Sequence, residues 1–340
     1  MSTPIELTNQ QVRLAARPVG LVQRRDFSFS EEPVREPDDG EALVDISYIS
    51  LDPAMRGWIA DLPSYIPPVG IGEVMRALAA GRVIASKHPG VAEGDRVTGL
   101  LGAQRYATVS GDALNKVDTY LARLPVHLGT LGMPGMTAYF GLLDIGRPQE
   151  GETVVVSGAA GAVGSVVGQI AKLQEARAVG IAGGPQKCRY ITDELGFDAA
   201  IDYKAGPLLA ALREHCPKGI DVYFDNVGGD VLDAALANLT RDARVVICGA
   251  ISQYNATDGM RGPANYLSLL VNHASMTGFV ITHYAHRLGE AARALAGWFA
   301  EGKLTAKVDV AEGLENFPEA LQRLFKGENT GKLVLKIAEE

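Results

Sequence analysis

Cysteine is scarce in this sequence, whose 340 residues include three, Cys188, Cys216 and Cys248. Because these three are far apart and odd in number, they predict no disulfide framework and favour a reducing, cytoplasmic compartment. The cysteines and the six histidines also lack the C-x-x-C or H-x-x-x-H spacing of zinc sites. The nearest histidine pair, His283 and His286, is more typical of a solvated helix start than of a metal site. We therefore expect a protein that binds no metal.

Long apolar runs and an excess of basic residues are also missing. The sequence has no run of about 18 apolar residues, the length that a transmembrane helix needs. The polar stretch 1–18 contains no apolar core of a signal peptide, so secretion is not expected. Lys and Arg number 32 against 40 Asp and Glu, which gives a formal net charge of -8. With no basic excess to neutralise phosphates, we expect neither a nucleic-acid nor a membrane partner.

The pattern of the chain changes near residue 130. The earlier part is rich in Gly, Pro and short β-branched runs, and it shows no helical periodicity. From about Thr130, apolar strands and helices alternate about six times, which is typical of a doubly wound parallel sheet. From about Asp309 the chain reads as a helix, a turn and a strand that can return to the first part. We expect an α/β fold with domains 1–129 plus 309–340 and 130–308.

Within the alternating region the sequence predicts six strands and the helices between them. One helix is expected to begin at about Val163, and a second is expected to end at Gly196. Three more are expected over 206–215, 230–239 and 264–273. The strands are expected at 153–157, 177–184, 199–201, 221–225, 243–249 and 276–281.

The turn after the first of these strands resembles one that holds the pyrophosphate of a dinucleotide. Where the usual fingerprint reads Gly-x-Gly-x-x-Gly, residues 159–164 read Ala-Ala-Gly-Ala-Val-Gly. Gly161 allows backbone N–H groups to approach phosphate, and Gly164 allows the next helix to pack closely. Ala159 suits the turn if its φ is negative. A tightly packed turn without a ligand is the alternative, and the strand–helix repeats around it favour the cofactor site.

The end of the next strand indicates which cofactor is bound. NAD sites usually carry Asp or Glu there, about 20 residues past the glycines. Here Gly183 and Gly184 follow the strand, no acid precedes Asp193, and Lys187 adds a positive charge. This favours the 2′-phosphate of NADPH, while a solvated lysine at a helix start is the alternative.

Two later strand ends offer polar groups, and ligands of parallel sheets bind at these ends. Asn226 follows the strand 221–225. A long loop, residues 248–263, follows the next strand and carries Tyr254 near its centre. Long loops at this edge are usually functional, so Tyr254 is a candidate hydroxyl donor. A buried structural tyrosine is the alternative.

These motifs together resemble the zinc-independent medium-chain dehydrogenase/reductases. Within that family the chain looks like the branch of 15-oxo-prostaglandin 13-reductase (leukotriene 12-hydroxydehydrogenase) and bacterial curcumin reductase. The resemblance covers nearly the whole chain and is carried by residues 51–59, 132–146, 158–172, 194–204, 221–229, 247–255, 278–281 and 327–336.

The resemblance implies a GroES-like catalytic domain, a Rossmann domain and NADPH in the cleft between them. It assigns the pyrophosphate to Gly161, Ala162, Val163 and Gly164, the adenosine phosphate end to Lys187 and Tyr203, and the nicotinamide to the vicinity of Thr137. The other cofactor contacts that it implies are Asn226, Cys248, Gly249, Ala250, Ile251, Ser252, Gln253, Tyr254, Phe279, Val280, Ile281 and Asn329.

One departure from the family bears on the substrate. Members that act on prostaglandins often have tyrosine in the motif D-P-Y-M-R, where this chain has Ala54 before Met55 and Arg56. These two residues and Tyr65, a candidate to replace the missing ring, are the expected substrate contacts. The family reaction transfers to this chain, whereas the identity of the substrate does not.

The function that these observations predict is NADPH-dependent reduction of the C=C bond of an α,β-unsaturated ketone or aldehyde. The cofactor supplies hydride to the β-carbon, and the protein orients the enone and stabilises the enolate oxygen, with Tyr254 as the candidate catalytic residue. The α-carbon can receive its proton from Tyr254 or from water. The alternatives are a quinone reductase of the ζ-crystallin kind and a nucleotide-binding protein without turnover. The family also implies a homodimer, formed by sheet-edge pairing through residues 276–281.

Overall fold

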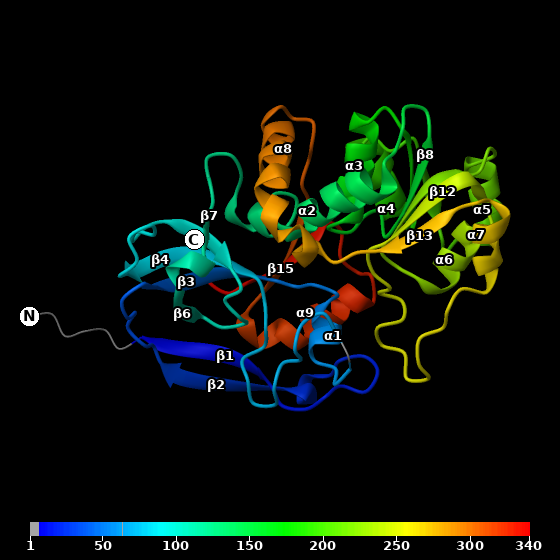
Figure 1. Cartoon of the computed structure of the whole chain (residues 1–340). Coiled ribbons are helices and arrows are strands. Elements are labelled where there is room, and N and C mark those ends of the chain that lie inside the picture. Colours follow the sequence, from blue (N-terminus) through cyan, green and yellow to red (C-terminus); the bar gives the residue numbers. More distant parts are fainter. Residues whose placement is uncertain (1–6, 63) are drawn as a thin grey trace, which may run out of the picture. The chain divides into compact units, whose positions relative to one another are not determined.

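Six parallel strands form the sheet of one of two units in the computed structural model, which describes residues 7–62 and 64–340 (Figure 1). This unit is Gly129–Lys307, and its strand order β10-β9-β8-β11-β12-β13 reverses direction between β8 and β11. That order is the doubly wound, Rossmann-like arrangement predicted from the alternating pattern. The strands are β8 (Thr153–Ser157), β9 (Arg177–Ala182), β10 (Ala199–Asp202), β11 (Ile220–Asp225), β12 (Leu239–Ile247) and β13 (Ser275–Gly278).

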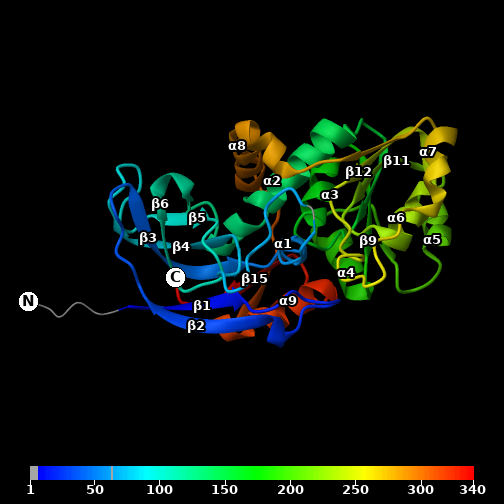
Figure 2. The ribbon, with the colours of Figure 1, turned by 60° about the horizontal axis from the view of Figure 1, so that its bottom comes forward.

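Helices cover both faces of this sheet. Successive residues of a strand point to opposite faces, so Val154 and Val156 pack into one cluster while Val155 packs into the other. The first cluster includes side chains of α2, α3 and α8, and the second includes side chains of α5, α6 and α7 (Figure 2). The helices of this unit are α2 (Met133–Phe140), α3 (Gly164–Leu173), α4 (Pro185–Arg189), α5 (Leu208–His215), α6 (Gly229–Leu236), α7 (Leu267–Val271) and α8 (Leu288–Ala300).

The other unit combines Met1–Leu128 with Val308–Glu340 and is built mainly of antiparallel strands. Its seven-stranded sheet includes the tail strand β15, which pairs with β3, and β1 and β2 form a separate pair (Figure 1). Helix α9 buries Phe317 against Phe27, with the ring centroids 5.5 Å apart. The elements are β1 (Thr8–Leu14), β2 (Phe27–Pro33), β3 (Glu41–Ser50), α1 (Met55–Trp58), β4 (Ala79–Ser86), β5 (Arg96–Gly99), β6 (Tyr106–Ser110), β7 (Asn115–Lys116), β14 (Val308–Glu312), α9 (Phe317–Phe325) and β15 (Lys332–Lys336).

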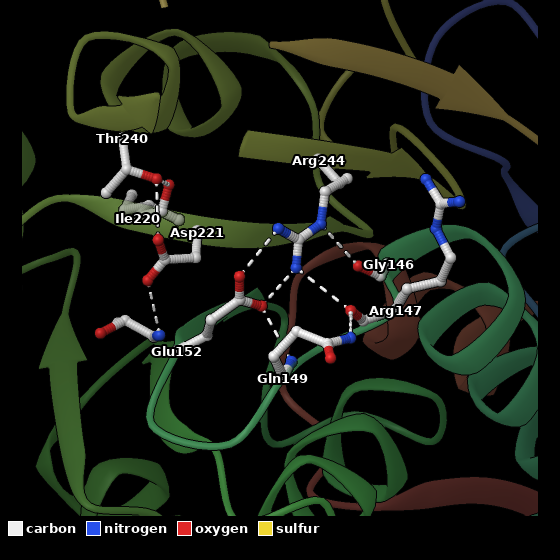
Figure 3. Close-up of polar contacts among 9 residues, drawn as sticks. Gly146, Arg147, Gln149, Glu152, Ile220, Asp221, Thr240 and Arg244 are labelled. Carbon is white, nitrogen blue, oxygen red and sulfur yellow. Dashed lines mark hydrogen bonds and ion pairs between the residues drawn. The ribbon is translucent and has the colours of Figure 1, made fainter. Parts of the chain in front are cut away.

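A polar network closes the amino-terminal edge of the parallel sheet. Arg244 of β12 donates to Glu152 over 2.9 Å and to the carbonyl of Gly146 over 2.9 Å (Figure 3). Burial raises the pKa of Glu152, but hydrogen bonds from Arg244 and from a backbone N–H hold it below its ordinary value. Asp221 accepts from the backbone N–H of Thr153 over 2.8 Å and joins β11 to β8. The polar side chains at the amino-terminal edge are thus hydrogen-bonded within the protein. A ligand is expected at the opposite, carboxyl-terminal edge of the sheet.

The structure differs from the sequence analysis at α1 and α2, neither of which was predicted, and at three further elements. Helix α8 was not predicted, although its packed residues Ala291, Leu295 and Trp298 recur at helical spacing. Strand β14 was also missed, since none of its five residues is buried. The strand predicted at 276–281 ends at Gly278, so Phe279 lies beyond it. Of the helices formed by residues 7–62 and 64–340, none combines the length and hydrophobicity of a bilayer span.

Candidate functional site

The ends of β8 and β11 meet at the point where the strand order reverses. Ser157, the last residue of β8, accepts a hydrogen bond at its hydroxyl from the backbone N–H of Asn226 over 2.8 Å. The amide side chain of Asn226 donates in turn to the Ser157 carbonyl over 2.8 Å. Ligands of doubly wound sheets bind in the crevice at such a reversal, so these two residues mark the candidate site.

The turn from β8 into α3 fits a phosphate group. Gly158 adopts a φ of +60°, whereas Ala159 does not adopt positive φ and is fully buried. A Cβ atom on Gly164 would lie 2.4 Å from the Gly158 carbonyl oxygen, so only glycine lets α3 start this close to the turn. In the part of the chain that the structure describes, no side chain caps α3. The N–H groups of Ser165 and Val166 already donate to the carbonyls of Gly161 and Val163. The donors that can serve an anion beside the positive dipole end are therefore those of residues 162–164.

A buried carboxylate holds the neighbouring strand ends together. Asp225, 1% exposed, accepts from the Ser157 hydroxyl over 2.8 Å and from the Tyr223 hydroxyl over 3.0 Å. It also accepts from the backbone N–H groups of Val227 and Gly228, over 3.1 and 3.0 Å. Burial raises the pKa of Asp225, against the opposing effect of these hydrogen bonds. The donors come from β8, from β11 and from the turn after β11, so one side chain fixes all three.

The loop after β12 is tied to the same place. The backbone N–H of Cys248 donates to the Asp225 carbonyl over 2.9 Å, and that of Ile251 donates to the Asn226 carbonyl over 3.2 Å. Ser252 donates through its hydroxyl to the Val227 carbonyl over 2.6 Å. Burial, followed by the nearby Asp225, raises the pKa of the Cys248 thiol to about 12, which keeps it protonated and unreactive.

Tyr254 bends back toward the start of this loop. Its hydroxyl accepts a hydrogen bond from the backbone N–H of Ala250 over 3.1 Å. A Cβ atom on Gly249 would lie 3.0 Å from that hydroxyl oxygen, so the glycine leaves room for it. The side chain of Gln253 bonds the backbone of Arg261 in both directions, which braces the outer part of the loop. The hydroxyl of Tyr254 is thus held beside the end of β12.

Residues near the ends of β9 and β10 form a second part of the candidate site. Gly184 adopts a φ of +93°, and a Cβ atom on it would meet nothing within 4 Å. Lys187 follows on α4, and Tyr203 lies across Gly183 from the end of β10. The structure adds an acid that the sequence analysis overlooked, because Asp202 accepts from the Gly184 N–H over 2.8 Å.

A cluster of aromatic rings anchors the segment after β13. Phe279 is close enough to α2 that a Cβ atom on Gly141 would lie 2.7 Å from its ring. The rings of Phe140 and Tyr284 stack with centroids 4.3 Å apart, and Arg287 lies over Phe140 at 5.0 Å. Rings fixed in this way hold the backbone of Phe279 and of the half-buried Val280 and Ile281. Thr137, on the same helix as Phe140, donates its hydroxyl to the Met133 carbonyl over 2.8 Å.

Comparisons with known proteins identify the family. The family model described as N-terminal domain of oxidoreductase matches residues 10–117, and the one described as Zinc-binding dehydrogenase matches 162–297. The chain is 45% identical to the NADPH-dependent curcumin reductase of Escherichia coli over 97% of both proteins. The chain belongs to the zinc-independent medium-chain dehydrogenase/reductases. It is also 39% identical to prostaglandin reductase 1 of Bos taurus over 94% of this chain and 96% of the other.

A solved structure agrees with this medium-chain reductase fold throughout. CurA from Vibrio vulnificus in complex with NADPH is 44% identical, with a TM-score of 0.92. The comparison covers 97% of this chain and all of the other. Despite the name of the second family model, no cluster of three or more His, Cys, Asp or Glu side chains suited to a metal occurs among the described residues.

Four site residues that the reductase family implies belong to the unit that contains β3. Met55 is fully buried in the core of that unit, and Arg56 donates to the carbonyls of Gly20 and Pro18. Tyr65 is 58% exposed, so its ring is accessible to a small molecule.

The fourth residue, Asn329, is buried and donates its amide to the Gly331 carbonyl over 2.9 Å. Three residues further along the chain, the buried Lys332 donates to Asp52 over 2.6 Å and to the Leu51 carbonyl over 2.9 Å. These bonds fix the start of the segment that carries Met55 and Arg56.

Sequence reasoning missed two residues that organise this reductase site, Asp225 and Ser157. Both stand at the last position of a predicted apolar strand, so their location at the ligand-binding edge could have been inferred. Their contact could not, because it depends on β8 pairing with β11 across 68 residues of sequence.

The turn after β8 generates a prediction about the two glycines of the fingerprint. Gly164→Ala should lower the free energy of unfolding by about 1–3 kcal/mol, because its Cβ atom would collide with backbone. Gly161→Ala is the comparison variant, since its Cβ atom would lie 3.2 Å from the Gly158 carbonyl, a contact that a small shift relieves, and its φ is not positive. We expect it to lower the free energy of unfolding less than Gly164→Ala does in urea unfolding. Equal destabilisation by both substitutions would contradict this description of the turn.

Proposed function

We propose that this protein is an NADPH-dependent reductase of the C=C bond of α,β-unsaturated ketones and aldehydes. The observation that carries the proposal is the turn at Gly158 and Gly164, where the missing Cβ atom of Gly164 lets the start of α3 pack against the end of β8 at the strand reversal. It occurs in a chain 45% identical to a curcumin reductase named as NADPH-dependent and 44% identical to CurA, whose structure contains NADPH. The turn fits a pyrophosphate, and Gly184 and Lys187 fit the adenosine end.

The chain's own groups would hold the cofactor and the enone. When NADPH is bound, it supplies the hydride that adds to the β-carbon of the substrate. The N–H groups at residues 162–164 would bind the pyrophosphate, and Gly161, whose own N–H donates to the Gly158 carbonyl, would allow its close approach. Thr137 and residues 279–281 would border the nicotinamide. The hydroxyl of Tyr254 would donate to the carbonyl oxygen of the enone, whose negative charge grows as hydride arrives. The proton that completes the reaction then reaches the α-carbon from Tyr254 or from water.

We assign substrate selectivity to residues of the unit that contains β3. In the motif D-P-Y-M-R, Ala54 replaces the tyrosine that prostaglandin-reducing relatives often carry. The hydroxyl of the exposed Tyr65 accepts a hydrogen bond from the indole N–H of Trp58 over 3.4 Å. We propose that Met55, Arg56 and Tyr65 shape the wall next to the substrate. Met55 and Arg56 would act through the backbone that they fix, because both are buried.

A substrate panel tests this function. The purified protein should oxidise NADPH rapidly with an enone and an enal but not with a saturated ketone, because the saturated ketone has no C=C bond conjugated to its carbonyl. A quinone is included because its reduction gives a hydroquinone, which separates the quinone reductase alternative from the proposed function. Loss of NADPH absorbance gives the four rates, and the product of the enone should be the saturated ketone. Turnover of the quinone alone would instead support a quinone reductase, and no turnover at all would support a binding protein.

The role of Tyr254 gives a second prediction. Tyr254→Phe removes the hydroxyl donor and should lower kcat for an enone by about 10²–10³-fold. The dissociation constant of NADPH and the melting temperature are the controls, and both should change little. A Phe variant whose kcat stays within about threefold of the parent would make Tyr254 a packing residue.

We also propose a homodimer formed through β13. This strand is at the edge of the sheet and all four of its residues are exposed, as are Leu270 and Val271 on the preceding helix, at 79% and 77%. An exposed strand edge beside apolar side chains favours pairing with a second copy. Sedimentation equilibrium should therefore give twice the chain mass of 36.0 kDa, and a monomer would refute the dimer.

The location that we propose for the enzyme is the cytoplasm. Cys188, Cys216 and Cys248 are all free thiols, as is usual in a reducing compartment. When cells that express the natural protein are fractionated, the protein should be recovered in the cytosolic fraction. Recovery in another fraction would refute this proposal.

A further inference from the structure

Two side chains from the end of β10 lie across the end of β9. A Cβ atom on Gly183 would lie 2.8 Å from the ring of Tyr203 and 3.1 Å from Cε of Lys204. Such distances are too short for a side chain at position 183, so the glycine is what allows Tyr203 and Lys204 to occupy this place. The ammonium of Lys204 lies 5.7 Å from the centroid of the Tyr203 ring, within reach of a cation–π contact.

Asp202 holds the backbone on which these side chains stand. Its carboxylate accepts from the Gly184 N–H over 2.8 Å and from the Lys204 N–H over 3.0 Å. The bond from Gly184, followed by that from Lys204, lowers the pKa of Asp202. An acid at this edge could in principle accept from a ribose hydroxyl, as in NAD sites. Here Oδ1 accepts from backbone N–H groups of both strand ends, so that oxygen serves to fix their spacing.

The space beside Gly184 is open and close to positive charge. A Cβ atom on Gly184 would meet no atom within 4 Å. Lys204 is exposed, and its Cε would lie 3.1 Å from a Cβ atom on the neighbouring Gly183, while Lys187 stands three residues beyond Gly184 on α4. A phosphate monoester carries about -1.5 to -2 charge at neutral pH, more than a single lysine neutralises. An anion of this kind matches the charge of the two lysines on the segments next to Gly184, Lys187 on α4 and Lys204 after β10.

We propose that Lys204 is a specificity-determining residue, whose ammonium binds the 2′-phosphate of NADPH together with Lys187. This rests on the proposed function, because it assigns a new residue to the cofactor site. Lys204 would discriminate against NADH, which has a hydroxyl in place of the phosphate, and Tyr203 would hold the lysine in position. Asp202 contributes as a positioning residue through the two backbone N–H groups.

The test compares dissociation constants of NADPH and NADH for the parent and four lysine variants. Lys204→Ala should weaken NADPH about ten- to hundredfold and leave NADH nearly unchanged, since one charge-assisted bond is lost. Lys187→Ala should act in the same direction. Lys218→Ala is the matched control, because that exposed lysine precedes β11 at the opposite edge of the sheet. Lys204→Arg keeps the charge and should restore most of the affinity for NADPH.

The outcomes separate this inference from the proposed function. If the parent binds NADPH and NADH equally well, the cofactor assignment itself is wrong. If the parent prefers NADPH and Lys204→Ala behaves like Lys218→Ala, the role of Lys204 is refuted and the function is retained. Equal weakening of both cofactors by Lys204→Ala would also refute it, since that result indicates a general effect on the fold. Adenosine 2′,5′-bisphosphate and AMP provide the same comparison without the nicotinamide.

Discussion

The buried carboxylate of Asp225 is the interaction on which the candidate site depends. A charge at this depth is tolerated only with several donors around it, and four groups supply them: Ser157, Tyr223, Val227 and Gly228. Because these donors come from two strands and the turn between β11 and α6, satisfying the charge fixes the spacing of the strand ends. Backbone pairing sets the register of β8 and β11, and the hydrogen-bonded carboxylate extends this order to the turn beyond the strands.

The proposed function depends on the groups at this carboxyl-terminal edge of the parallel sheet. The turn at Gly158 directs the start of α3 toward the crevice, and the loop that carries Tyr254 is bonded to the backbone of Asp225 and Asn226. A dinucleotide bound along the edge would therefore meet rigid N–H donors at its phosphates and a positioned hydroxyl near its reactive end. Most of the catalytic work assigned to the protein is orientation and charge stabilisation, since the cofactor carries the hydride.

The parts of this account that the sequence predicted are those that depend on local pattern. The apolar run before Gly158 and the helix after it identify β8 and α3, and the repeats after them predict a doubly wound sheet. Asp202 shows what local pattern cannot supply. It lies 18 residues beyond Gly184 in the chain and reaches it only because β10 pairs with β9, placing Asp202 opposite Ala182. The same holds for Lys204, which looks like an ordinary solvated lysine until the strands are paired.

The most direct test of the central claim follows the transferred hydride itself. The enzyme would be supplied with an enone and with NADPH that carries deuterium at the transferable position of the nicotinamide. Mass spectrometry and NMR of the product should find one deuterium at the β-carbon of a saturated ketone, with the proton at the α-carbon drawn from solvent. Deuterium at the carbonyl carbon of an alcohol would contradict the account, because it would make the protein a carbonyl reductase. Oxidation of NADPH without transfer of the label to the substrate would contradict it as well.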